Sequence, residues 1–429
     1  MVAFSKSWSS LGLALCVAHA SAAAISLRAS NSSARSVVKK CVGYDYPRVL
    51  CLDRYASVLN PDFRRPANNE LANPDKLTDT VVPSDPHWDD IKKADFVIFD
   101  EKLAAEFLGT DDQLEFLFEI TAGGHEAPVY APNTNEFYFS DLATGVDGLS
   151  QQVIDLSTEP PTLGRVTADP PIYAPAGARY RKGLIYYSTA GGNTSLDGLT
   201  YRPGVVSFDP VTKKSEVLVN NYYGYYFNTA DDLDIDEKGG IWITDLQYGR
   251  NVGLNTEWQQ LEAATYRFDQ ETGSVSLVED SLGAPNGVSF SPDFKTLYLT
   301  DSNADWANTD PTVPNEEVQY LTYNTTGKRT IYAYDVDETQ TVISNKRAIY
   351  LAVDFVPDGL KVAENGYLVT STGHGIDVLT PKGVPILRIQ TNYTTASIDF
   401  GGPDYDQLFI VGHGGVSRVK WGLKGQAFK

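Results

Sequence analysis

Apolar and polar positions alternate in a pattern that returns six times along the chain. Each copy begins at a polar or small residue, continues as an apolar strand, turns at Gly, Pro or Asp, and returns as a second apolar strand. We refer to the first position of each copy as its anchor; the anchors are Glu126, Ala176, Asp231, Asn286, Asp358 and Ala396. Their average spacing of about 54 residues is typical of a four-stranded sheet repeated radially. The pattern predicts an all-β fold, a six-bladed β-propeller, which protects its strand edges by closing on itself.

The anchors are predicted to meet at one face of this propeller. In the third copy, a strand at Leu233–Ile235 is followed by a turn at Asp236–Gly240 and a strand at Ile241–Thr244. A hairpin of this kind brings the chain back to the level at which it began. Because every copy is built alike, the anchors and the loops after the second strands should surround a common mouth.

Two strands are predicted before the first anchor, at Phe96–Phe99 and Leu114–Ile120. We expect both to complete a blade begun by the C-terminal strands, so that the two chain ends close the ring. The longest interval between anchors contains the polar segment Asp305–Lys328. This segment is predicted to be an inserted loop that shapes a binding site.

The first 22 residues have the pattern of a secretory signal peptide. Lys6 precedes the apolar run Leu11–Val17, and small residues follow, with a cleavage site predicted near Ala20 or Ala22. The apolar run is too short to span a bilayer, so the protein is expected to be secreted and extracellular. We expect residues 23–92 to form an irregular N-terminal extension wrapped over the propeller, which would comprise residues 93–429.

Removal of the signal peptide would leave Cys41 and Cys51 as the remaining cysteines. In an oxidising compartment we expect them to form a disulfide; two free thiols are the alternative. The same compartment would permit N-glycosylation, for which the chain carries four sequons. Their asparagines are Asn31, Asn193, Asn324 and Asn392.

Composition favours strands over helices and excludes some classes of partner. Aromatic residues make up 11% of the chain, with 25 Tyr and a single Met, which suits half-buried strands better than helices. The formal net charge is −20 and the pI is about 4.6. Such acidity argues against nucleic acid and against an anionic membrane surface as partners.

Four anchors carry side-chain oxygen atoms, and we predict that they form a metal site. These anchors are Glu126, Asp231, Asn286 and Asp358. Three carboxylates that converge on one cavity would repel one another unless a cation or a proton intervened. Oxygen ligands favour a hard cation such as Ca²⁺, with Mg²⁺ or Mn²⁺ as alternatives. The competing interpretation is that the Pro-Asn-Gly and Pro-Asp-Gly triplets form ordinary turns, with Gly287 and Gly359 as turn glycines.

Three histidines fall at the predicted mouth, namely His125, His374 and His413. Histidine titrates near neutral pH, so these side chains are candidates for proton transfer. The alternative is that each of them hydrogen-bonds a Gly-rich loop. The aromatic run Tyr222–Phe227 precedes the third anchor, and one or two of its side chains are expected to contact a ligand.

Several segments carry a resemblance to a known family. The most specific are Pro285–Asp293, Leu297–Asp301 and Pro357–Leu360. They resemble the family of regucalcin (senescence marker protein), gluconolactonases and related calcium-dependent lactonases, over roughly residues 94–420. His125–Tyr130 and Phe227–Asp232 are similar to the secreted fungal lactonohydrolase branch. The resemblance implies a six-bladed propeller in which Glu126, Asn286 and Asp358 bind the metal ion and Asp358 is also the general base.

One position departs from the pattern of this family. Where the family has Asn followed by Asp, this chain has Asp231 followed by Asp232. An additional carboxylate would strengthen cation binding and discourage an anionic substrate. It could also replace or assist the usual base.

Together with the resemblance, these residues predict a secreted, metal-dependent hydrolase that opens a small, aldonolactone-like lactone. Asp358 or Asp231 would accept a proton from the attacking water, and His125, His374 or His413 would protonate the leaving ring oxygen. Two alternatives remain open. One is an isomerase or cyclase of secondary metabolism that uses the same metal site, and the other is a non-catalytic propeller that binds a ligand.

Overall fold

The computed structural model describes residues 36–66, 76–120, 125–192, 195–255, 257–307, 312 and 321–427. From Ser36 onward these residues belong to one compact unit. The signal peptide predicted at residues 1–22 and the sequons at Asn31 and Asn193 lie outside the described residues. Within the described ranges, no helix is long and apolar enough to cross a bilayer.

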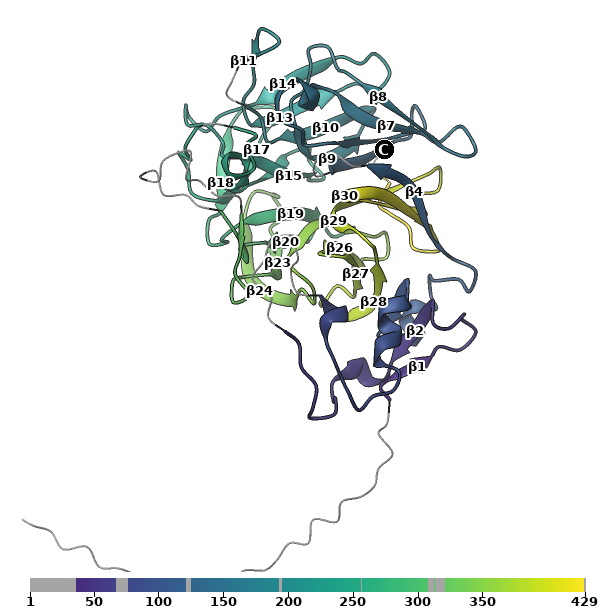
Figure 1. The fold of residues 1–429 in the computed structure, drawn as a ribbon. Coiled ribbons are helices and arrows are strands. Elements are labelled where there is room, and N and C mark those ends of the chain that lie inside the picture. Colours follow the sequence, from purple (N-terminus) through teal and green to yellow (C-terminus); the bar gives the residue numbers. More distant parts are fainter. Residues whose placement is uncertain are drawn as a thin grey trace, which may run out of the picture. The chain divides into compact units, whose positions relative to one another are not determined.

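The fold is a mainly-β propeller with six large sheets, which we number in chain order and describe from the innermost strand outward (Figure 1). Sheet 1 consists of β5 (Glu126–Ala131), β6 (Glu136–Ser140), β7 (Gln151–Asp155) and β8 (Thr162–Val166). Sheet 2 consists of β9 (Pro175–Arg181), β10 (Leu184–Thr189), β13 (Gly204–Phe208) and β14 (Ser215–Val219). Sheet 3 consists of β15 (Ala230–Ile235), β16 (Ile241–Asp245), β17 (Ala264–Phe268) and β18 (Val275–Glu279).

The remaining sheets differ in their number of strands. Sheet 4 consists of β19 (Pro285–Phe290), β20 (Thr296–Asp301), β23 (Thr330–Val336) and β24 (Ile343–Leu351). Sheet 5 consists of β25 (Pro357–Val362), β26 (Leu368–Thr372), β27 (Gly375–Leu379), β28 (Pro385–Gln390), β3 (Phe96–Ile98), β2 (Val49–Leu52) and β1 (Val38–Lys40). Sheet 6 consists of β29 (Thr394–Gly401), β30 (Gln407–Lys420) and β4 (Leu114–Ile120).

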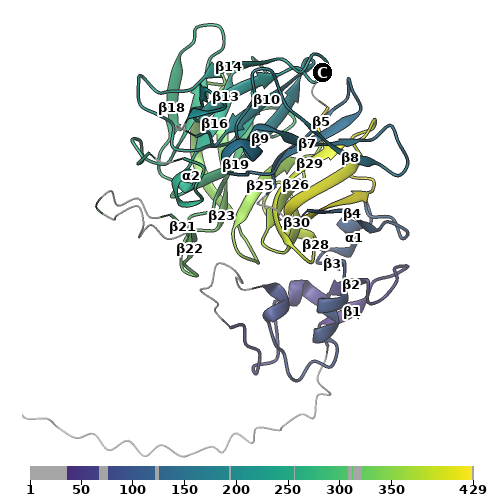
Figure 2. The ribbon, with the colours of Figure 1, turned by 45° about the horizontal axis from the view of Figure 1, so that its top comes forward.

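Short elements lie in the connections between strands, most of them within a single sheet (Figure 2). Two small hairpins are formed by β11 (Ser195–Leu196) with β12 (Leu199–Thr200) and by β21 (Asp305–Trp306) with β22 (Thr322–Tyr323). Among the described residues, the helices are α1 (Glu101–Ala104), α2 (Tyr248–Asn251) and 3₁₀ turns at Asp53–Ala56, Leu77–Asp79, Trp88–Lys93 and Gly145–Leu149. The hairpin β21–β22 belongs to the long inserted segment predicted between the anchors of sheets 4 and 5.

Hydrophobic packing between neighbouring sheets closes the ring. The innermost strands contact one another in chain order, and β29 of sheet 6 contacts β5 of sheet 1. Each boundary between two neighbouring sheets contains its own cluster of buried apolar side chains. At the closing boundary, the rings of Phe137 and Phe409 stack with their centroids 4.2 Å apart. The hydrophobic effect therefore acts at six separate interfaces, which together hold the inner strands around one axis.

One of the two early strands completes the C-terminal sheet. β4 pairs antiparallel with the second half of β30, as predicted. The expectation that Phe96–Phe99 joins the same sheet is wrong, because β3 pairs with β28 of sheet 5 and, on its other edge, with β2. The strand is apolar on both faces. Phe96 and Ile98 pack into the core between sheets 5 and 6, and Val97 packs against the N-terminal extension.

The predicted disulfide is present in the N-terminal extension. Cys41 and Cys51 are bonded, with their Cα atoms 5.3 Å apart, and both side chains are buried. The bond closes the loop between β1 and β2, so it ties together the two strands that the extension adds to sheet 5.

Candidate active site

All six anchors line one cavity of about 830 Å³. Each of them lies within the first three residues of the inner strand of its sheet. The structure therefore brings Glu126, Asp231, Asn286 and Asp358 together as the repeat predicted, with Ala176 and Ala396 at the other two positions. Their metal-binding role stays a prediction.

A β-bulge accompanies the anchor in every sheet. In sheets 3, 4 and 5, the register shifts by one residue across Ala230–Leu233, Pro285–Val288 and Pro357–Leu360. The same irregularity occurs at the anchors of sheets 1, 2 and 6. A bulge places one extra residue in one strand, bends that strand and redirects a side chain. The repeated bulge is therefore the local backbone feature that accompanies the orientation of the anchors toward the cavity.

The glycines that follow two of the anchors permit close packing of neighbouring sheets. A Cβ atom on Gly287 would lie 2.5 Å from the carbonyl oxygen of Asp358, and one on Gly359 would lie 2.9 Å from Cα of Ser397. Both glycines lie within strands. The interpretation of these triplets as ordinary turns is therefore wrong, because the glycines are required by the close approach of the next inner strand.

Burial and mutual repulsion dominate the electrostatics of the anchor acids. Burial raises the pKa of Glu126 well above its usual value, and the nearby Asp358 and Asp231 add to the increase. The pKa of Asp231 is raised by burial first and then by Asp358 and Asp232. Burial also raises the pKa of Asp358, although a hydrogen bond from Asn286 opposes this change. The acids therefore resist simultaneous ionisation unless a positive charge lies beside them.

Asp231 and Asp232 have different environments. Asp231 lines the cavity. Asp232 is buried, and its carboxylate accepts hydrogen bonds from the backbone N–H groups of Leu233 (2.8 Å) and Val288 (3.3 Å). Its Oδ1 also lies 3.7 Å from Nζ of the buried Lys361. Asp232 thus links sheet 3 to sheets 4 and 5, while Asp231 is the member of the pair that faces the cavity.

The three candidate histidines differ in their access to the cavity. His413 lines the cavity with the anchors, and together with His374 it also lines a neighbouring pocket of about 520 Å³. His374 does not line the cavity with the anchors, and it also borders a further pocket of about 370 Å³. His125 is completely buried, its Nδ1 hydrogen-bonds the carbonyl oxygen of Gly412, and its Nε2 lies 3.5 Å from Oδ1 of Asp141. The expectation that all three lie at the mouth is therefore wrong. His125 instead packs between sheets 6 and 1.

The pKa values of these histidines favour the neutral form. Burial and the neighbouring His125 lower the pKa of His413. Burial, with Lys76 and Arg388 nearby, lowers the pKa of His374 to about 4. Burial is also the main cause of the lowered pKa of His125.

The cavity also contains Thr229, Tyr248 and Asp305, which the sequence did not single out, although the last two belong to the loops after second strands that were expected at the mouth. Asp305 is buried, and its Oδ1 has no hydrogen-bond partner within the described part of the chain. The hydroxyl of Tyr248 lies 2.8 Å from the backbone carbonyl oxygen of Asp305 and holds the start of β21 in place. The sequence signals for Asp305 are its place in the loop Asp301–Asp305, after the second strand of the fourth copy, and at the start of the inserted segment Asp305–Lys328.

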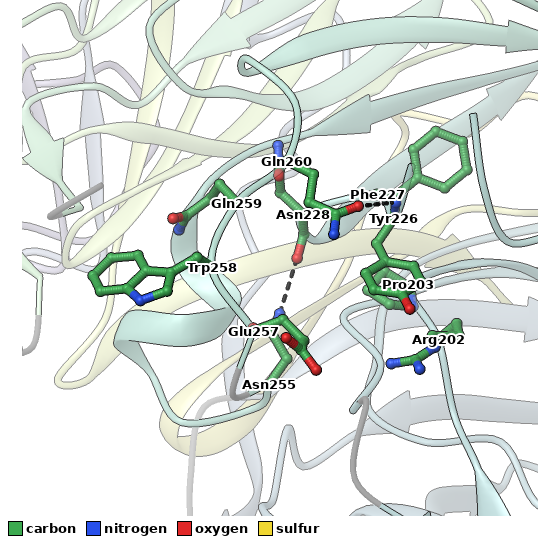
Figure 3. A pocket seen from close by; sticks show the side chains of 10 residues that line it. All are labelled: Arg202, Pro203, Tyr226, Phe227, Asn228, Asn255, Glu257, Trp258, Gln259 and Gln260. Carbon is green, nitrogen blue, oxygen red and sulfur yellow. Dashed lines mark hydrogen bonds between the residues drawn. The ribbon is translucent and has the colours of Figure 1, made fainter. Parts of the chain in front are cut away.

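The aromatic run before the third anchor does not line this cavity in the described structure. Tyr226 and Phe227 instead border a small pocket of about 20 Å³ (Figure 3), where the backbone N–H of Tyr226 donates to Oε1 of Gln260 at 2.9 Å. A space of this size holds about one water molecule. The larger cavity, which contains the anchors, is therefore the candidate active site.

The donor set around the cavity suits a hard divalent cation. The carboxylates of Glu126, Asp231 and Asp358 and the amide of Asn286 all offer oxygen ligands, and a bound cation would relieve the repulsion that raises their pKa values. In the described parts of the chain, however, no three His, Cys, Asp or Glu side chains are close enough together to hold a metal ion by themselves. A bound ion would therefore need the amide oxygen of Asn286 as a further ligand, or small movements of the three carboxylates toward one another.

The sequence profile of the SMP-30/gluconolactonase/LRE-like family matches residues 125–309 and 307–413, and the chain belongs to this family. The resemblance noted in the sequence is thereby confirmed. Two similar curated proteins come from Aspergillus oryzae. The chain is 49% identical to lactonohydrolase oryL over 391 residues, which cover 91% of this chain and 89% of that protein. It is 42% identical to lactonohydrolase oryH, with 98% of both proteins covered.

Solved structures support the fold. A gluconolactonase from Xanthomonas campestris superimposes with a TM-score of 0.57 at 23% identity, covering 76% of this chain and 94% of that one. The calcium-binding protein regucalcin from Agrobacterium tumefaciens superimposes with a TM-score of 0.54 at 14% identity, covering 74% and 96%. At these identities the likeness establishes the propeller architecture alone.

Proposed function

We propose that this protein is a hydrolase that opens a small lactone, with a divalent cation, preferably Ca²⁺, as its cofactor. The observation that carries the proposal is the convergence of all six anchors on one cavity, four of them with oxygen-bearing side chains. The two curated relatives that match nearly the whole chain are lactonohydrolases. We also propose that the six sheets are the six blades of a closed propeller, as is usual for the fold of these relatives.

We assign the metal-binding role to Glu126, Asp231, Asn286 and Asp358. When bound, the cation would polarise the lactone carbonyl and stabilise the negative charge that develops on its oxygen. The alanines at the other two anchors, Ala176 and Ala396, leave space beside these ligands for the substrate.

Asp358 is assigned as the general base. Its carboxylate would accept a proton from the water whose oxygen attacks the carbonyl carbon. The bond between that carbon and the ring oxygen then breaks, and the ring oxygen takes up a proton to become the hydroxyl group of the product. His413 lines the cavity and is assigned as the relay: its neutral imidazole takes up the proton that Asp358 accepted and passes it to the ring oxygen, so that both side chains return to their starting states. Because its pKa is lowered, a proton placed on its imidazole is released readily.

We further propose that the protein is exported. The Cys41–Cys51 disulfide is typical of proteins that fold in an oxidising compartment. The sequon residues Asn324 and Asn392 are exposed and accessible to glycosylation. Treatment of the secreted protein with a glycosidase, followed by mass measurement, tests this part of the proposal.

Removal of the metal tests the proposed reaction. Hydrolysis of a panel of γ- and δ-lactones is measured with the purified protein, after EDTA treatment, and after addition of Ca²⁺, Mg²⁺ or Mn²⁺. We expect activity to be lost on chelation and restored by at least one of these ions. The Asn286→Ala variant should need a higher concentration of that ion to regain activity than the exposed control Asn133→Ala. Full turnover after verified metal removal would exclude the cofactor, and no turnover of any lactone by the metal-loaded protein would exclude the reaction.

A further inference from the structure

One part of the cavity has no chemical role in the reaction described above, beyond the space that Ala176 leaves for the substrate. It is an apolar surface formed by the side chains of Leu142, Ala176, Ala190, Val252 and Leu254, which we call the apolar wall. Ala176, Ala190 and Leu254 belong to a single buried hydrophobic cluster, and the half-buried Leu142 and Val252 pack against it. The wall is therefore one continuous surface that extends from the protein interior into the cavity.

A second apolar contribution comes from Leu321 and Phe355, which also line the cavity. Phe355 has a φ of 39°, a left-handed conformation that is rare for a bulky side chain. Its ring packs against that of Tyr323 in β22, with their centroids 5.1 Å apart. Backbone conformations of this kind persist where the surrounding structure maintains them, and they cluster at ligand sites. The inserted hairpin thus holds an aromatic side chain at the cavity.

The charged part of the cavity is uniformly acidic. It contains the three anchor acids and two more, Asp147 and Asp305. Among the described residues that line the cavity, none is Lys or Arg. A substrate that carries a carboxylate or phosphate would therefore have to approach these acids without a cationic side chain to pair with it. A bound divalent cation would be taken up by the anchor ligands.

We propose that the substrate is an uncharged lactone with an aliphatic or other apolar substituent several carbons long, which lies against the apolar wall. This inference rests on the proposed function and names the substrate class of that site. It differs from the aldonolactone-like substrate expected from the sequence. Sugar hydroxyl groups placed against Leu142, Val252 and Leu254 would lose hydrogen bonds to water and gain no partner from these side chains.

The size of the cavity agrees with a substituted ring. Its volume of about 830 Å³ lies in the range of pockets that enclose drug-sized molecules. An unsubstituted five-membered lactone has only six non-hydrogen atoms and would leave most of this space to water. A substituent several carbons long would cover the wall and remove that water.

The chain-length dependence of the wild-type, metal-loaded enzyme tests the proposal. The value of kcat/KM is measured for γ-lactones with alkyl substituents from none to six carbons, for glucono-δ-lactone, and for a γ-lactone whose six-carbon substituent ends in a carboxylate. Each methylene group that reaches the wall should raise kcat/KM by about fourfold. The carboxylate-ended lactone should react at least tenfold more slowly than its uncharged counterpart.

Two outcomes would overturn the inference while leaving the proposed function in place. One is a kcat/KM that is the same for every chain length, and the other is a higher kcat/KM for glucono-δ-lactone than for the long-chain lactones. If no lactone is hydrolysed at all, the proposed function itself fails. The panel therefore distinguishes the two failures.

Substitutions in the wall provide an independent test. Val252→Ser should reduce the gain in kcat/KM per methylene, while Val217→Ser, at an exposed position of the outer strand β14, should leave it unchanged. Val252→Lys should introduce a positive charge and raise kcat/KM for the carboxylate-ended lactone relative to the uncharged one. A gain per methylene that survives both changes at Val252 would place the substituent elsewhere.

Discussion

Two parts of the cavity lining are built in different ways. The anchors lie on the inner strands, where hydrogen-bonded ladders and inter-sheet packing hold them. The apolar side chains Leu142, Val252 and Phe355 instead come from connecting segments after β6, after α2 and before β25. Connecting segments tolerate sequence change more readily than the elements they join. The difference indicates that the ring positions the reacting groups, while the connections select the substrate.

The largest expected effect comes from removing the assigned base in the ring. Asp358→Asn should lower kcat by about a thousandfold for every lactone in the panel, because the variant cannot accept the proton from water. The exposed Asp404→Asn is the matched control. If the loss is confined to long-chain lactones, Asp358 acts in substrate selection, and the division between ring and connections is refuted.

A smaller effect on catalysis is expected from the histidine that lines the cavity. His413→Gln should lower kcat by about tenfold to a hundredfold, because proton delivery to the leaving ring oxygen becomes slower. His374→Gln should retain wild-type kcat, since His374 does not line the cavity that contains the anchors. Steady-state kinetics on a lactone with a poor leaving group would show the difference most clearly. Equal losses in the two variants would remove the assignment of His413.

The rigidity of the ring can be tested through its stability. Gly287→Ala should lower the free energy of unfolding by about 2 kcal/mol, because the new Cβ would lie 2.5 Å from the carbonyl oxygen of Asp358. Gly164→Ala on the outer strand β8 is the control, since its nearest neighbour would lie 3.7 Å away. Thermal and denaturant unfolding measure both changes. Equal stability of the two variants would mean that the inner strands can move apart without penalty.

The smallest expected effect is a pH-dependent gain in stability. Since folding raises the pKa of Asp231, its stabilising contribution is complete below the unfolded value near 4 and is lost as the pH rises through the folded value. Asp231→Asn should therefore raise the melting temperature of the metal-free protein at pH 8 by about 1–3 °C, and by less at pH 5. A lower melting temperature at pH 8 would contradict the repulsion between the anchor acids. Added Ca²⁺ should cancel the gain.

Local sequence patterns predicted most of the fold. The alternation of strands and turns identified the repeat, and the anchors read from it all face one cavity. Neighbouring residues do not predict the partner of a strand that is apolar on both faces, so the sequence pattern predicts the wrong sheet for Phe96–Phe99. The same limit applies to Gly287 and Gly359, whose requirement for glycine arises from a strand of the next sheet.

The sequence by itself therefore determined the propeller architecture, the six anchors and the disulfide, because hydrophobic periodicity, turn residues and cysteine pairing are properties of short segments and simple counts. Only the tertiary structure decided which of the three histidines lines the cavity and which is buried, and that apolar side chains form one wall of the space that the anchors line. These features depend on how segments far apart in the chain pack against one another. Packing of that kind leaves no regular spacing in the sequence.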